Sequence, residues 1–116
     1  MSIVIWHNPR CSTSRKVLQL LRDNGVEPQI RDYQKSPPSA AELKAVLARL
    51  GKPAAGLIRR KERATLKEAG LEGGSPAEAD YIAAMVRFPV LIERPVVIKG
   101  DKAAVGRPPE AVLAIL

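Results

Sequence analysis

The sequence predicts an α/β fold with a central mixed sheet, and three observations lead to this prediction. The apolar run Ile3–Trp6 is typical of a strand. A segment with apolar residues at helical spacing follows it, and then a second short run of strand type, Ile30–Tyr33. Later in the chain, the β-branched run Val96–Ile98 and the segment Lys102–Val105 flank Gly100-Asp101, which is a hairpin signal.

The opening of the chain predicts a βαβ unit. One face of the predicted helix carries four apolar residues at helical spacing: Val17, Leu18, Leu20 and Leu21. Asn24-Gly25 is a signal for the end of this helix. Two strands connected through a helix in this way are parallel and joined by a right-handed crossover. We therefore expect the first two strands to be neighbours or near-neighbours in one sheet.

A helical insert is expected at about residues 37–88, between the second and third strands. Its first helix begins with the capping box Ser39–Glu42, and residues 53–72 are expected to hold one or two short helices. The segment Ser75–Glu78 is a second capping box, with Pro76 at the first helical position. Three apolar residues of the helix that follows are expected to face inward: Ile82, Met85 and Val86.

Pro109 is expected to begin a last helix that runs through Leu116. The resulting order is βαβ, a helical insert and then ββα, which is a thioredoxin-like arrangement. The 116 residues contain no repeat and no low-complexity tract, and this length suffices to bury one core. We therefore predict a single domain spanning residues 1–116.

Charge and composition narrow the possible ligands and the compartment. The net charge of +7 suits anionic ligands, which include nucleic acid, an acidic protein and a small oxyanion. Cys11 is the only cysteine, so no disulfide can form within the chain, and this favours a reducing compartment. No apolar run approaches the roughly 20 residues that span a bilayer. We expect a cytoplasmic protein that does not associate with membranes.

The segment His7–Arg15 is the place where the sequence predicts chemistry. It joins the first strand to the N-terminus of the first helix, where the helix dipole favours a thiolate at Cys11. Arg10, Arg15 and His7 add positive charge nearby, and the hydroxyls of residues 12–14 can donate hydrogen bonds to sulfur. The thiolate is the nucleophilic form of cysteine, and the same amides can hold a tetrahedral oxyanion.

Spacing excludes several classes of enzyme. The low-molecular-weight phosphatases and the arsenate reductases related to them need Cys-x5-Arg, but Val17 stands at the required position. A dithiol oxidoreductase needs Cys-x-x-Cys, and Ser14 occupies the second place. The sequence has no Cys/His cluster for a metal and no Gly-rich nucleotide loop. We therefore expect neither a metal nor a bound organic cofactor.

The motif His7-Asn8-Pro9-x-Cys11-x-x-Ser14-Arg15 resembles the active-site loop of the glutaredoxin-coupled ArsC-type arsenate reductases. The resemblance covers essentially the whole chain and includes Leu91-Ile92-Glu93-Arg94-Pro95 and Gly106-Arg107-Pro108-Pro109-Glu110. The sequence is most similar to the short YfgD-like branch of the family, and Ser12 stands where many members have glycine.

This resemblance implies a role for each matched residue. Cys11 corresponds to the nucleophile, His7 to the histidine that assists its ionisation, and Ser14 to a further catalytic residue of the loop. Three arginines correspond to the ligands of the oxyanion: Arg59 (or its neighbour Arg60), Arg94 and Arg107. Guanidinium groups suit this role because they pair bidentately with tetrahedral oxyanions and keep their charge. Three residues are expected to support the loop: Asn8, Arg15 and Pro95.

The implied reaction is the reduction of arsenate, with phosphate or sulfate as non-productive mimics. This reduction takes two electrons, which two thiols supply, and Cys11 provides only one of them. Glutathione is therefore expected as cosubstrate and glutaredoxin as partner, with the protein acting as a monomer. Thioredoxin-like folds open the strand that faces the cysteine with a cis-proline, so we predict a cis Arg94–Pro95 bond.

Three alternatives stay open at this point. A thiol reductase acting on another substrate could keep the same residues. A regulator similar to Spx, which binds RNA polymerase, shares this fold family, but the usual Cys-x-x-Cys switch is missing here. A basic nucleic-acid-binding module fits the charge but lacks stacking surface, since only four residues are aromatic: Trp6, Tyr33, Tyr81 and Phe88. Nucleic acid is thus not expected as a partner.

Overall fold

The computed structural model describes residues 2–116 and has the α/β architecture that the sequence predicts. Its internal contacts divide the chain into two compact units. One consists of the residues up to Ser36 together with Arg94–Leu116, and the other is Pro37–Glu93, close to the insert expected at about 37–88. Within the described residues, no helix is both long and apolar enough to cross a membrane.

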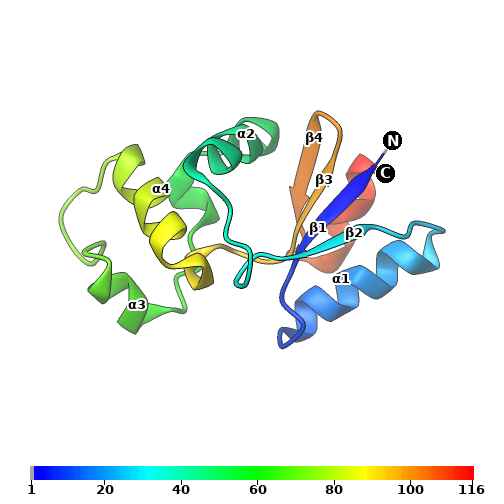
Figure 1. The fold of residues 1–116 in the computed structure, drawn as a ribbon, viewed down its shortest axis with the longest axis horizontal. Helices are drawn as coiled ribbons and strands as arrows, with labels where there is room; N and C mark the ends of the chain where they lie inside the picture. The colour runs from blue at the N-terminus through cyan, green and yellow to red at the C-terminus, as the bar shows by residue number, and fades with distance from the viewer. Residues whose placement is uncertain (1) are drawn as a thin grey trace. The chain divides into compact units, whose positions relative to one another are not determined.

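The first unit is built on a mixed four-stranded sheet in the order β2-β1-β3-β4 (Figure 1). Its strands are β1 (Ile3–His7), β2 (Gln29–Asp32), β3 (Val96–Lys99) and β4 (Lys102–Val105). β1 pairs in parallel with β2, as the βαβ opening predicts, and antiparallel with β3. β3 and β4 form the expected antiparallel hairpin. The thioredoxin-like prediction is confirmed.

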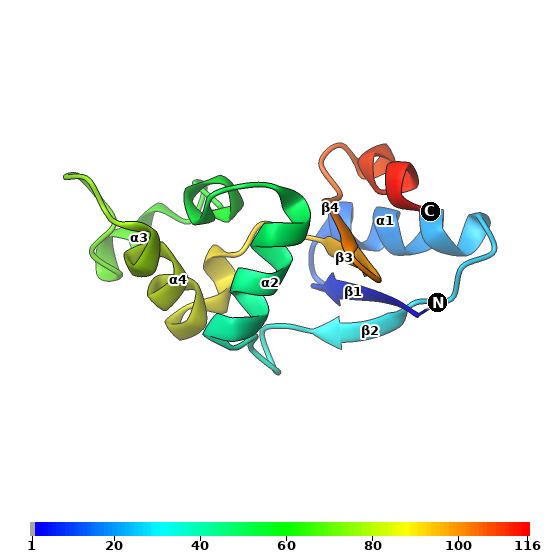
Figure 2. The same cartoon turned by 90° about the horizontal axis from the view of Figure 1, so that it is seen from above.

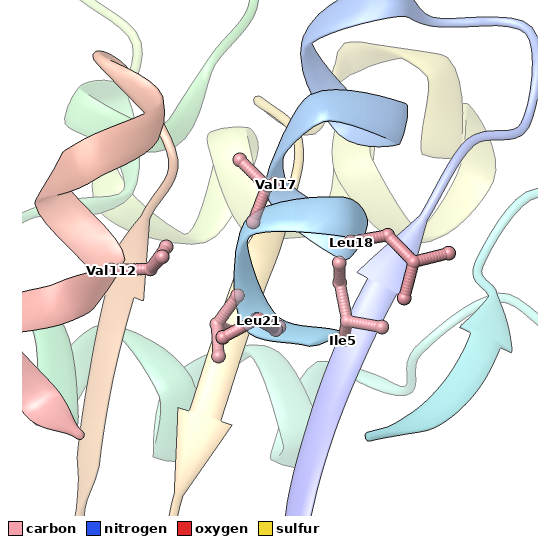
Figure 3. Close-up of a cluster of buried hydrophobic side chains, with 6 residues drawn as sticks. Ile5, Val17, Leu18, Leu21 and Val112 are labelled. Atoms are coloured by element: carbon pink, nitrogen blue, oxygen red, sulfur yellow. The ribbon is translucent and has the colours of Figure 1, made fainter. Parts of the chain in front are cut away.

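One face of this sheet is covered by α1 (Ser12–Asp23) and by the 3-10 helix η3 (Pro109–Ile115), as Figure 2 shows. The core between them consists of six buried residues: Ile5, Val17, Leu18, Leu21, Val97 and Val112. All of them except Val97 are labelled in Figure 3. Helix α1 ends where predicted, because Gly25 adopts a positive φ of 77° that most residues disfavour. This packing fixes the N-terminus of α1 relative to the sheet.

The register of the sheet brings four chain segments to one edge of the sheet, the edge formed by the carboxyl ends of β1 and β2. His7, the last residue of β1, pairs with Asp32, the last residue of β2. Trp6 pairs with Val96 at the start of β3, and Val96 pairs with Val105 at the end of β4. The residues that follow β1, β2 and β4 and those that precede β3 therefore meet at the same edge. This is the edge at which the Cys11 loop lies.

The second unit, Pro37–Glu93, is helical. Its elements are α2 (Ala40–Leu50), η1 (Ala54–Leu57), α3 (Arg63–Glu68), α4 (Glu78–Arg87) and η2 (Pro89–Leu91). Helix α2 begins with the predicted capping box, since Ser39 and Glu42 exchange side-chain-to-backbone hydrogen bonds of 3.1 and 3.0 Å. One or two short helices were expected within residues 53–72, and the structure has two there, η1 and α3.

The prediction of a second capping box at Ser75–Glu78 is wrong. The backbone of Ala77 is extended, so α4 begins at Glu78, and it is Asp80 that accepts a hydrogen bond of 2.8 Å from the Ala77 N–H. The carboxylate of Glu78 instead accepts 3.0 Å hydrogen bonds from the backbone N–H of Ala54. Here a tertiary partner of Glu78 replaced the local one that the spacing predicts.

Three further differences concern single elements. The C-terminal helix, expected from Pro109 through Leu116, is a 3-10 helix and ends at Ile115. Val86 is 36 % exposed, whereas Ile82 and Met85 are buried as expected. Strand β2 ends at Asp32, so Tyr33 belongs to the turn after it. The cis Arg94–Pro95 bond is confirmed, and Arg107–Pro108 is a second cis bond that the sequence analysis missed.

Candidate active site

Cys11 is the N-cap of α1, where the sequence analysis placed it. The loop before it is a tight turn, since the Cys11 N–H donates a 3.0 Å hydrogen bond to the backbone oxygen of Asn8. The Asn8 side chain accepts another from the Arg10 N–H, also at 3.0 Å. Arg15 donates from Nη1 to the backbone oxygen of Pro9 at 2.8 Å. Asn8 and Arg15 therefore hold the shape of the loop.

Ser14 connects this loop to the end of β1. It is fully buried, and its hydroxyl oxygen accepts a 3.0 Å hydrogen bond from the Asn8 N–H. The same oxygen lies 2.6 Å from Nδ1 of His7, a hydrogen bond whose donor depends on the tautomer of the ring. The hydroxyl of Ser14 is thus engaged with His7 and Asn8, and it is the backbone N–H of Ser14 that helps to lower the pKa of Cys11.

The surroundings of His7 disfavour the positive charge that was expected on its ring. Burial lowers the pKa of His7; the nearby carboxylate of Asp32 raises it, and the guanidinium groups of Arg15 and Arg22 lower it further, with a net shift downward. The ring is therefore neutral at pH 7. His7 contacts the loop through Ser14, and a positive charge on His7 is not what favours the Cys11 thiolate at that pH.

Two arginines from the far end of the chain lie beside Cys11. Nη2 of Arg107 is 3.8 Å from the Cys11 sulfur, and the guanidinium of Arg94 also hydrogen-bonds to that sulfur. Nε of Arg107 donates a 3.0 Å hydrogen bond to the backbone oxygen of Arg94, so the two are fixed relative to each other. Arg94 is buried, with 7 % of its surface exposed.

These neighbours favour the ionised form of the Cys11 thiol. Burial raises the pKa of Cys11, but backbone N–H groups of Ser14 and Thr13 and the guanidinium of Arg94 lower it by more. The pKa therefore lies below its ordinary value, as the sequence analysis predicted. The physical cause is hydrogen-bond donation and positive charge at a helix N-terminus.

The absence of a side chain at Gly106 lets the chain after β4 pack closely enough to place Arg107 beside Cys11. A Cβ atom at residue 106 would lie 2.6 Å from Cγ2 of Val17 and 3.0 Å from Cγ of Pro95. The Gly106 N–H also donates a 2.9 Å hydrogen bond to the backbone oxygen of Pro95. Pro95, predicted as a supporting residue, thus packs against the residue that precedes Arg107.

Arg59 lies in the helical unit. Its N–H donates a 2.7 Å hydrogen bond to the backbone oxygen of Leu91, next to a β-bridge between Ile58 and Ile92. Its guanidinium is 3.4 Å from the carboxylate of Glu62 and 3.7 Å from that of Glu93. Arg60, the alternative, stacks on the ring of Tyr81 at 5.8 Å. The role of Arg59 in oxyanion binding stays a prediction.

Tyr33 lies at this edge as well and was not predicted from the sequence as a site residue. Its side chain is fully buried, and its hydroxyl oxygen accepts a 3.4 Å hydrogen bond from Nη1 of Arg94. Its position just after a strand that runs parallel to β1 was a usable signal, because carboxyl ends of parallel strands meet at one edge. Within residues 2–116, no group of His, Cys, Asp or Glu side chains could hold a metal ion.

A thioredoxin-like sheet with one activated cysteine at the N-cap of its first helix defines a thiol-based oxidoreductase class. Within it, the chain belongs to the ArsC family, whose model matches residues 6–115. It is 46 % identical to the protein YfgD of Escherichia coli K12, over 98 % of this chain and 96 % of that protein.

Two relatives are named arsenate reductases. The chain is 40 % identical to one from Haemophilus influenzae, with 100 % of both chains covered. Among solved structures, it resembles an arsenate reductase from Vibrio cholerae with a TM-score of 0.93 and 44 % identity. That match covers 100 % of this chain and 98 % of that one.

Proposed function

We propose that the protein is a cytoplasmic arsenate reductase in which Cys11 acts with glutathione and glutaredoxin. Two lines of support lead to this function. The chain has full-length relatives that are named arsenate reductases. It also places a low-pKa thiol beside two buried or half-buried arginines, which suits a nucleophile that attacks an oxyanion.

In the first step, the Cys11 thiolate attacks arsenic(V). The sulfur donates the electron pair of a new S–As bond, and one As–O bond breaks with its pair going to oxygen. The oxygen leaves as hydroxide, or as water after it takes up a proton. Arg94 and Arg107 hold the negative charge of the oxyanion in this step, which is the role of guanidinium groups in anion sites.

In the second and third steps, external thiols supply the electrons. The thiol of glutathione replaces a second oxygen on arsenic, which leaves as water. A glutaredoxin thiolate then attacks the glutathione sulfur, so that a mixed disulfide forms and the S–As pair stays on arsenic. Arsenic is now in the +3 state, and hydrolysis of its bond to Cys11 releases arsenite and the thiol. The second thiol must be external because Cys11 is the only cysteine.

The observation that carries this proposal is the contact between Cys11 and the two arginines that flank the β3–β4 hairpin, Arg94 before β3 and Arg107 after β4. Nη2 of Arg107 lies 3.8 Å from the sulfur, and Nε of the same side chain is anchored to Arg94. A structural cysteine gains nothing from guanidinium neighbours, since its neutral thiol is a weak acceptor. A nucleophile that must be ionised next to an anionic substrate needs them.

The test is steady-state arsenate reduction by the purified protein with each reductant supplied separately. Glutathione with glutaredoxin should sustain turnover, glutathione alone should be much slower, and Cys11→Ser should abolish activity. If thioredoxin and its reductase sustain turnover with no small thiol present, the proposed reductant is wrong. If no reductant system gives Cys11-dependent turnover, arsenate is not the substrate.

A further inference from the structure

Arg94 faces a neutral oxygen on Tyr33, at the edge of the sheet where Cys11 lies. Tyr33 follows β2, and its hydroxyl oxygen accepts a 3.4 Å hydrogen bond from Nη1 of Arg94. Tyr33 is fully buried and Arg94 is 7 % exposed, so water cannot readily take the place of this contact. The two residues are 61 positions apart, and the sheet brings them together.

We propose that Tyr33 is a positioning residue that holds the guanidinium of Arg94 on Cys11 and, resting on the proposed function, on the bound oxyanion. The tyrosine touches neither the sulfur nor the substrate in this proposal. It acts through Arg94 alone.

The neutrality of the Tyr33 oxygen is central to this role. Burial raises the pKa of Tyr33, with Gln34 and Arg94 acting in the opposite direction, so the phenol stays protonated at pH 7. A neutral acceptor orients a guanidinium without cancelling its charge. The full positive charge of Arg94 therefore remains available to the Cys11 thiolate and to an anionic ligand.

Arg59 provides a contrast within the same chain. Its guanidinium lies next to the carboxylates of Glu62 and Glu93, at 3.4 and 3.7 Å, which offset its charge. A carboxylate in the place of the Tyr33 hydroxyl would do the same to Arg94 and would favour the protonated thiol of Cys11. The buried phenol of Tyr33 accepts a hydrogen bond from Nη1 of Arg94 without this effect.

The test removes one oxygen atom from the protein. Tyr33→Phe keeps the buried ring, and Tyr81→Phe is the matched control, because Tyr81 is the only other tyrosine and lies in the helical unit. The readout is the rate of iodoacetamide alkylation against pH, which reports only on Cys11, the single cysteine. Thermal unfolding of each variant checks the fold.

We expect Tyr33→Phe to move the alkylation midpoint to higher pH, because Arg94 loses its orientation toward the thiolate. Binding of inorganic phosphate, followed by calorimetry, should weaken about 3- to 10-fold, the range for one ordinary hydrogen bond, because Arg94 keeps its charge and loses only its orientation. Tyr81→Phe should leave both values unchanged. A midpoint that stays the same or falls in Tyr33→Phe overturns the proposal.

A double-mutant cycle distinguishes an effect of Tyr33 that acts through Arg94 from a general disturbance of the fold. In an Arg94→Met background, Tyr33→Phe should cause no further shift of the midpoint, because the group that it positions is gone. Equal shifts in both backgrounds would contradict a role through Arg94. The midpoint needs neither arsenate nor phosphate, so it decides the proposal even if the arsenate assay fails.

Discussion

Gly106 is the position where one added methyl group should disturb both the core and the site. The Cβ of Gly106→Ala would lie 2.6 Å from Cγ2 of Val17, about 1 Å inside an ordinary carbon–carbon contact. It would also lie 3.0 Å from Cγ of Pro95. The φ of Gly106 is not positive, so the effect is steric only. Val17 is on α1, which carries Cys11, so relief of the clash moves Cys11 and Arg107 apart.

Gly106→Ala should lower the free energy of unfolding. Overpacking of a well-packed core by one methyl group costs about 1–3 kcal/mol. For a chain of this size, that corresponds to a fall in Tm of about 4–12 °C. The alkylation midpoint of Cys11 should also rise, because Arg107 moves away from a sulfur that it now approaches to 3.8 Å.

Thermal unfolding followed by circular dichroism measures the first effect, and alkylation against pH measures the second. Gly56→Ala is the matched control, since its Cβ would meet nothing closer than Lys52 at 3.6 Å. That variant should be neutral, or more stable by up to about 1 kcal/mol. If Gly106→Ala unfolds at the same temperature as Gly56→Ala, the close packing at Gly106 does not constrain this edge of the sheet.

Three further predictions concern the site. Alkylation of wild-type Cys11 should have a midpoint below about 8.5, the value for a free cysteine, and a higher midpoint would contradict an activated thiolate. Alanine substitution of Arg94 or Arg107 should weaken phosphate binding about 10- to 100-fold, as one charge-assisted pairing is lost; Arg59→Ala, titrated in the same way, decides whether Arg59 belongs to the site. In the folded protein the pKa of His7 lies below its ordinary value of 6.5. As the pH drops, the unfolded chain therefore takes up a proton at this residue before the folded protein does. The free energy of unfolding should then fall as the pH drops below about 6.5. His7→Gln should lack this part of the fall, and identical pH profiles for the two proteins would show that His7 is not the cause.

Local signals in the sequence were enough to predict the elements and the nucleophile. The capping box at Ser39 and the stop at Gly25 depend on atoms a few residues apart, so both were predictable. The same holds for Cys11 at the N-cap of α1. The box at Ser75 failed because Glu78 bonds to Ala54, 24 positions away, and no local pattern contains that contact.

The sequence by itself determined the thioredoxin-like order of elements and the position of the reactive cysteine, because periodicity, turns and caps act over short stretches of chain. The neutral state of His7, the engagement of Ser14 with it, and the contact between Tyr33 and Arg94 were decided only by the tertiary structure. The protonation state of a side chain and its hydrogen-bond partners depend on how the folded chain surrounds it. In this fold, the neighbours of a side chain can come from distant parts of the sequence, as with Cys11 and Arg107, which are 96 positions apart.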